Sequence, residues 1–179
     1  MTEQSRMNII NGVASLLVVA CGVIYSSLIG ALIHKAKEFV QTQTGYNISF
    51  ADLPVWALGF AYIVPGIIGV IATVVRAKGG YITHMVFSIL TLLIMGIFAI
   101  VGIIALGALA TANIPSCSSL GDKSAACAEA ESIYGMGVGA IIMIVFGWIF
   151  ALVSTILSGI MACKPEHVSN PVQFGSKPY

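Results

Sequence analysis

Few residues of this 179-residue chain could carry out chemistry, and they are scattered along it. The three histidines, His34, His84 and His167, are far apart, and no two have the spacing of metal ligands. His34 and His84 fall near the ends of apolar stretches, which is typical of polar residues at a membrane interface. No Ser-His-Asp or Cys-His set and no pair of carboxylates emerges. The sequence therefore predicts a protein that is not an enzyme and has no metal site and no cofactor.

The four cysteines suggest a structural role instead of a catalytic one. Cys117 and Cys127 stand in one polar segment, where a disulfide would close a loop of about 11 residues and stabilise by about 3 kcal/mol. Two free thiols are the alternative, whereas a metal pair is disfavoured because the spacing is unusual for zinc and no histidine is near. Cys21 is expected to pack within an apolar stretch. Cys163 is a candidate for S-palmitoylation beside Lys164, with an unmodified thiol as the alternative.

A glycine-rich segment, Gly135-Met136-Gly137-Val138-Gly139, resembles part of a nucleotide-binding loop. No predicted strand precedes it, although such a loop follows a strand. The segment lies within an apolar stretch, so a close contact between helices explains Gly135 and Gly139 better. Two further pairs of small residues have the same spacing, Ser26 with Gly30 and Ala57 with Ala61. All three pairs are predicted to pack helices closely.

The elements that carry these residues are long apolar stretches. Apolar residues make up 58% of the chain and charged residues 8%, and four stretches lack any Asp, Glu, Lys or Arg. A helix of about 20 apolar residues crosses the hydrocarbon core of a bilayer. We therefore predict an all-α fold, an antiparallel four-helix transmembrane bundle, as a single domain over residues 1–179. Its helices are expected at about 7–33, 53–75, 82–110 and 133–161, with outer loops at 34–52 and 111–132.

The loops suggest an orientation with both termini in the cytoplasm. In that orientation more of the Lys and Arg residues lie on the cytoplasmic side, as the positive-inside rule requires. Asn47-Ile48-Ser49 is an N-glycosylation sequon in the first outer loop, and Cys117 and Cys127 share the second. Glycans and disulfides both belong to the non-cytoplasmic side. Asn47 is a candidate for glycosylation, with an unmodified side chain as the alternative because the sequon lies close to the bilayer. We expect a multi-pass protein of the plasma membrane.

Polar residues within the spans are limited to hydroxyls and Asn11. These groups suit hydrogen bonds between helices, whereas ion-coupled carriers usually place charged residues inside the membrane. Pro65 lies in the middle of the second span and predicts a kink. The carbonyl that it frees, near Ala61, needs a hydrogen-bond donor, which a Ser, a Thr or a water could supply.

Two local patterns resemble a known family of four-span proteins. The first span opens with Ile9-Ile10-Asn11-Gly12 and continues to Gly22, and the second contains Pro54-Val55-Trp56, then Tyr62-Ile63 and Gly66. These patterns are similar to those of the membrane-spanning four-domains subfamily A. Tetraspanins and claudins are disfavoured because their cysteine motifs are absent. The resemblance implies a non-enzymatic plasma-membrane protein that self-associates and modulates other membrane proteins.

The sequence as a whole therefore favours an accessory or scaffold protein of the lipid bilayer. Its partners would be other transmembrane proteins or further copies of itself, and the near-neutral net charge of +1 gives no basic patch for nucleic acid. Recognition would use helix packing and an outer loop stapled by Cys117 and Cys127. An oligomeric channel or small-solute pore is the alternative, with helix-lining hydroxyls and the Pro65 kink as its gate. An enzyme is the third and weakest interpretation.

Overall fold

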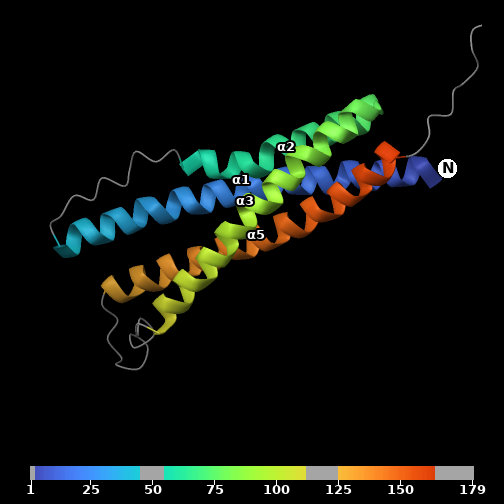
Figure 1. Ribbon diagram of the computed structural model, residues 1–179. Coiled ribbons are helices and arrows are strands. Elements are labelled where there is room, and N and C mark those ends of the chain that lie inside the picture. The colour runs from blue at the N-terminus through green and yellow to red at the C-terminus, as the bar shows by residue number, and fades with distance from the viewer. Residues whose placement is uncertain (1–2, 45–54, 112–124, 164–179) are drawn as a thin grey trace, which may run out of the picture.

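The computed structural model describes residues 3–44, 55–111 and 125–163, and these residues form four α-helices and no strand. Helix α1 covers Glu3–Thr44, α2 covers Val55–Val75, α3 covers Lys78–Thr111 and α5 covers Ala125–Cys163 (Figure 1). Each is long and apolar enough to cross a membrane. The predicted all-α fold of four long apolar helices is confirmed for this part of the chain.

Three helices are longer than the sequence analysis predicted. Helix α1 continues beyond residue 33 to Thr44, and α5 begins at Ala125 instead of residue 133, so parts of both predicted outer loops are helical. Helix α3 begins at Lys78, four residues before its predicted start. The predicted bounds followed the first charged residue, which ends an apolar stretch but does not end a helix. Strong helix formers such as Ala128 and Glu129 extend the helix beyond the apolar stretch.

The helices form a ring in which each neighbouring pair is antiparallel. Helix α1 packs against α2 and α5, and α3 completes the ring by packing against the same two helices. The start of α1, the turn between α2 and α3, and the end of α5 lie together, and we call this the N-terminal end of the bundle (Figure 1). The sides of the membrane on which the termini lie remain a prediction.

The turn between α2 and α3 contains only Arg76 and Ala77. Arg76 has a φ of 55°, and its N–H donates to the Ala72 carbonyl at 2.9 Å, which is the left-handed cap that often ends a helix. The predicted helix bounds left residues 76–81 between the two helices, so the predicted connection was longer and included Gly79 and Gly80. Both glycines belong to the first turn of α3, so the hairpin is tighter than expected.

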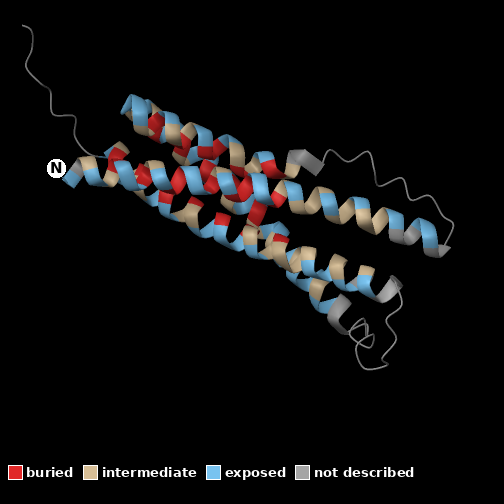
Figure 2. Ribbon diagram, turned by 180° about the vertical axis from the view of Figure 1, so that it is seen from behind, coloured by how far each residue is buried: buried red, intermediate tan, exposed pale blue. Residues whose placement is uncertain are grey.

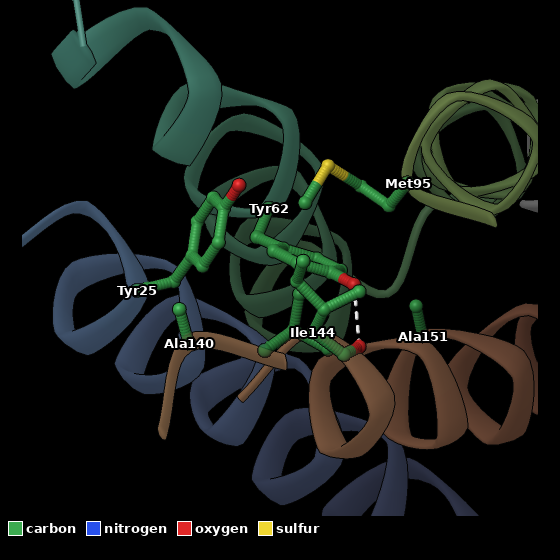
Figure 3. Packing of buried hydrophobic residues seen from close by; sticks show 7 residues of the cluster. Tyr25, Tyr62, Met95, Ala140, Ile144 and Ala151 are labelled. Atoms are coloured by element: carbon green, nitrogen blue, oxygen red, sulfur yellow. Dashed lines mark hydrogen bonds between the residues drawn. The ribbon is translucent and has the colours of Figure 1, made fainter. Parts of the chain in front are cut away.

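Buried residues concentrate towards the N-terminal end and the middle of the bundle, whereas the far ends of α1, α3 and α5 are mostly exposed or half-buried (Figure 2). An apolar core fills the middle. Tyr62 and Met95 are fully buried there, and the Tyr62 hydroxyl donates to the Ile144 carbonyl at 2.7 Å (Figure 3). A Cβ added to Gly147 would lie 2.9 Å from the Tyr62 ring, so the glycine leaves space for it. The interior at this level is filled by side chains.

Candidate functional site: a polar cluster shared by four helices

The most unusual feature of the interior is a connected group of buried polar side chains at the N-terminal end of the bundle. Its members come from all four helices and are hydrogen-bonded to one another. We call it the polar cluster; it consists of Asn8, Asn11, Ser15, Thr73, Tyr81, His84, Ser88, Ser154 and Ser158. All are buried except Thr73, which is half-buried. The described residues contain no buried side-chain nitrogen or oxygen that lacks a hydrogen-bond partner.

Asn11 of α1 lies at the centre of the polar cluster and is fully buried. Its side-chain oxygen accepts hydrogen bonds from the Ser154 hydroxyl at 2.8 Å and the Ser158 hydroxyl at 3.3 Å. Its side-chain nitrogen donates to the Thr73 hydroxyl at 3.4 Å. Asn11 therefore joins α1 to α5 on one side and to α2 on the other. The predicted helix-to-helix hydrogen bonding is confirmed for Asn11 and its partners. Ser26, Ser27 and Thr155 instead donate to carbonyls of their own helices.

His84 of α3 is 1% exposed and lies between two hydroxyls. Its Nδ1 lies 2.7 Å from the Ser158 hydroxyl and its Nε2 lies 3.2 Å from the Ser88 hydroxyl. His84 is enclosed by the bundle, because it shares one buried stripe of α3 with Ser88 and Thr91. Its predicted position at a membrane interface stays a prediction. Gly69 of α2 provides the space, because a Cβ there would lie 2.5 Å from Nε2.

A second layer lies between His84 and the N-terminal end of the bundle. The Tyr81 hydroxyl donates to the Asn8 side-chain oxygen at 2.6 Å, and the Asn8 side-chain nitrogen donates to the Thr73 carbonyl at 2.9 Å. Tyr81 precedes His84 by three residues, about 4.5 Å along the helix axis. This second layer connects α1, α2 and α3 near the start of the bundle.

The chemistry available to this cluster is limited. The pairing of Ser158 with His84 has the distance of a nucleophile and its base, which the sequence analysis did not expect. However, the ring nitrogen on the other side meets Ser88 instead of a carboxylate, and both hydroxyls are at most 2% exposed. The described residues also hold no group of three metal-binding side chains. The hydrogen bonds of the cluster join the four helices to one another.

Pro65 lies inside α2, and the carbonyl that it frees has a donor on the neighbouring helix. The Thr91 hydroxyl of α3 lies 2.6 Å from the Ala61 carbonyl and 3.0 Å from the Phe87 carbonyl of its own helix. The prediction that a Ser, a Thr or a water would satisfy the carbonyl near Ala61 is confirmed, with Thr91 as the donor. The kink itself stays a prediction.

Close approach of helices is concentrated between α1 and α2, and glycines that the sequence analysis did not select make most of it. A Cβ added to Gly59 would overlap the Ser26 hydroxyl, and one added to Gly66 would lie 2.5 Å from Val19. Gly12 also lies close to Thr73, with 2.9 Å from an added Cβ. Ser26 is thus at a close contact, as predicted.

The other predicted packing residues differ among themselves. Gly139 faces Leu28 of α1 at an ordinary distance of 3.6 Å from an added Cβ. Gly30 and Gly135 have no described atom within 4 Å of that position, so they do not bring described helices together. Ala61 packs at the edge of the apolar core. Ala57 belongs to α2, but its side chain lies outside the described residues.

Several predicted sites cannot be placed by the described residues. Asn47 and Cys117 lie outside them, as does the side chain of Cys127, which belongs to the first turn of α5. The disulfide and the glycan therefore stay predictions. Cys21 is a buried free thiol, as expected of a packing residue, and Cys163 is an exposed free thiol at the end of α5.

The fold and the polar cluster define a multi-pass integral membrane protein whose polar groups are enclosed by its own helices. No family model matches the chain. No curated protein and no solved structure matches it either.

Proposed function

We propose that this protein is a non-enzymatic accessory or scaffold protein of the membrane, which associates with other membrane proteins or with further copies of itself. The observation that carries the proposal is that the buried polar groups pair with one another inside the bundle, whereas the outer faces of the helices are apolar. The polar cluster is satisfied within the chain, and Tyr62 and Met95 fill the middle of the interior. A partner within the bilayer therefore meets the outer faces of the helices.

The surface that we assign to this association is the outer face around Gly135. Gly135 is exposed and has open space around it among the described residues, as does Gly107 of α3. Leu106 lies against Gly137, with 3.1 Å from an added Cβ, so Gly107 and Gly135 are at a similar height on neighbouring helices. Small exposed residues permit the close helix approach that drives association in lipid.

The proposal includes an orientation and a location. Both termini are placed in the cytoplasm by the distribution of Lys and Arg, and the protein is placed in the plasma membrane. In this orientation Asn47 and the disulfide between Cys117 and Cys127 face the outside. The resemblance to the membrane-spanning four-domains subfamily A supports the same function. Of its motif residues, Gly22 and Gly66 are buried between α1 and α2. Asn11 and Tyr62 are buried as well, and both also bond to α5.

Substitution of Gly135 by leucine tests the assigned surface. Native mass spectrometry of the full chain in a mild detergent should show a complex for the wild type. Gly135→Leu should reduce the associated fraction by about tenfold, because the side chain blocks close approach. Val145→Leu is the matched control. Val145 is exposed on the same helix, and the substitution adds only one methylene.

Two results would contradict the proposal. A wild-type protein that is monomeric at every protein concentration would remove the association itself. A Gly135→Leu variant that associates like the wild type would remove the surface. Gly139→Leu is a poorer test than Gly135→Leu, because Leu28 faces Gly139 and the bundle itself would be disturbed.

A further inference from the structure

His84 combines three properties that the proposed function does not use. It is an ionisable ring, it is 1% exposed, and both of its ring nitrogens face a hydroxyl. His34, by comparison, is exposed on α1. A hydroxyl can donate or accept a hydrogen bond, so Ser158 and Ser88 can pair with either protonation state of the ring.

The orientation of Asn11 sets the direction of the hydrogen bond at Nδ1. Ser158 donates to the Asn11 side-chain oxygen, 3.3 Å away, so it accepts from Nδ1 in the neutral and in the protonated ring alike. The Asn11 oxygen also accepts from Ser154, and the Asn11 nitrogen donates to Thr73. Protonation of His84 therefore requires only that Ser88 change from donor to acceptor at Nε2.

No carboxylate among the described residues faces His84 to offset such a charge. Ser88, Ser158 and Gly69 lie directly against His84. The rest of the polar cluster consists of uncharged hydroxyls and amides and the phenol of Tyr81. Among the described ionisable residues of the N-terminal end, Arg6, Arg76 and Lys78 are cations, and the acidic Glu3 at the start of α1 is exposed. A buried charge without a counter-ion is costly, and water that reaches the charge lowers this cost.

The layer formed by Asn8, Thr73 and Tyr81 stands between His84 and the N-terminal end. We propose that His84 is a proton-binding site, and that the bound proton opens the contact between Tyr81 and Asn8 to water. Protonation would then loosen the start of α1 from α3, while the apolar core around Tyr62 keeps the rest of the bundle closed. This inference does not depend on the surface around Gly135.

The experiment follows hydrogen exchange and the His84 ring in the same sample. The full chain carries His34→Gln and His167→Gln, so that His84 is the only histidine, and is placed in nanodiscs of phosphatidylcholine. Exchange of the amides of residues 5–15 and 78–85 is measured from about pH 8 to about pH 4 and corrected for intrinsic rates. Ring nitrogen chemical shifts report the protonation of His84 directly.

Acidification should increase exchange in these two segments by about tenfold, at the pH where the ring nitrogens change together. His84→Gln should remove this dependence, because glutamine keeps a donor and an acceptor but binds no proton. Tyr81→Phe should raise exchange at neutral pH, because the contact with Asn8 is lost. The proposal is overturned if the ring stays neutral throughout while the protein remains helical, or if His84→Gln retains the same response to pH.

Discussion

The hydrogen bond from Thr91 to the Ala61 carbonyl gives the sharpest prediction about stability. Thr91→Val keeps the shape of the side chain and removes only the hydroxyl. That hydroxyl lies 2.6 Å from the Ala61 carbonyl, whose donor within the helix would have been the missing N–H of Pro65. The variant therefore leaves a backbone carbonyl in the membrane interior without the partner that the structure provides.

The expected loss follows from the kind of bond that is removed. Hydrogen bonds between membrane helices contribute about 0.6 kcal/mol on average and about 1.7 kcal/mol at most. A buried acceptor that is left unsatisfied costs about 1–3 kcal/mol. Water cannot easily replace Thr91 at this depth, so we expect Thr91→Val to lower the free energy of unfolding by about 1–2 kcal/mol.

A matched control and a double-mutant cycle isolate this bond. Thr155→Val removes a hydroxyl that donates at 2.7 Å to the Ala151 carbonyl of its own helix, so it should cost less than about 0.5 kcal/mol. Pro65→Ala restores a backbone N–H that can donate to Ala61. In that background Thr91→Val should lose most of its effect, which gives a coupling of about 1 kcal/mol.

Unfolding by sodium dodecyl sulfate in mixed micelles is the assay, with Trp148 fluorescence as the signal in a Trp56→Phe background, because the chain contains two tryptophans. The Trp148 indole donates to the Leu92 carbonyl at 3.0 Å, so its emission reports the contact between α5 and α3. The explanation fails if Thr91→Val and Thr155→Val have equal effects, or if the effect of Thr91→Val is unchanged when Pro65 is replaced.

Two further predictions concern the glycines and the thiols. Gly66→Ala should destabilise by about 1–3 kcal/mol because its Cβ would lie 2.5 Å from Val19, whereas Gly107→Ala, with open space around it, should be neutral or stabilising; unfolding titrations of both variants compare them directly. A maleimide should label exposed Cys163 rapidly and buried Cys21 only after denaturation, as measured by intact mass. In the same labelling experiment, Cys117 and Cys127 should react only after reduction, and rapid labelling of both without reductant would contradict the predicted disulfide.

The four spans could be predicted from the sequence because the absence of charged residues is a strong signal. Their bounds could not, since α1 and α5 continue as polar helices beyond the apolar stretches. Asn11 and part of the hydroxyls, such as Thr91 and Ser154, were correctly assigned to bonds between helices, because a polar group in lipid must find a partner. For Ser27 and Thr155 that partner is a carbonyl of their own helix. The same argument found the need for a donor at Ala61.

The buried face of each helix was harder to predict, because lipid makes the outside as apolar as the inside. Only the polar residues mark the inner face, and their spacing does contain the signal. His84, Ser88 and Thr91 are separated by four and three residues, which places them on one stripe of α3. That stripe would have placed His84 inside the bundle. The partners of His84 depend on the register between helices, which spacing alone does not give.

The glycines between α1 and α2 show the same limit. Gly12 and Thr73 meet only because the two helices have one particular antiparallel register, which also brings Gly59 onto Ser26. Nineteen glycines in the chain leave many pairs with suitable spacing, so selecting pairs by sequence alone included Gly30 and Gly135, which have no close described neighbour. Packing partners had to come from the structure.

The unfolding free energy of Asn11→Leu tests most directly whether the polar cluster holds the four helices together. Leucine has the same branching as asparagine but cannot form its three side-chain hydrogen bonds, to Thr73, Ser154 and Ser158. At about 0.6 kcal/mol each, these bonds predict a loss of about 2 kcal/mol. Stability equal to or above that of the wild type would contradict the claim that Asn11, at the centre of the polar cluster, holds the helices together.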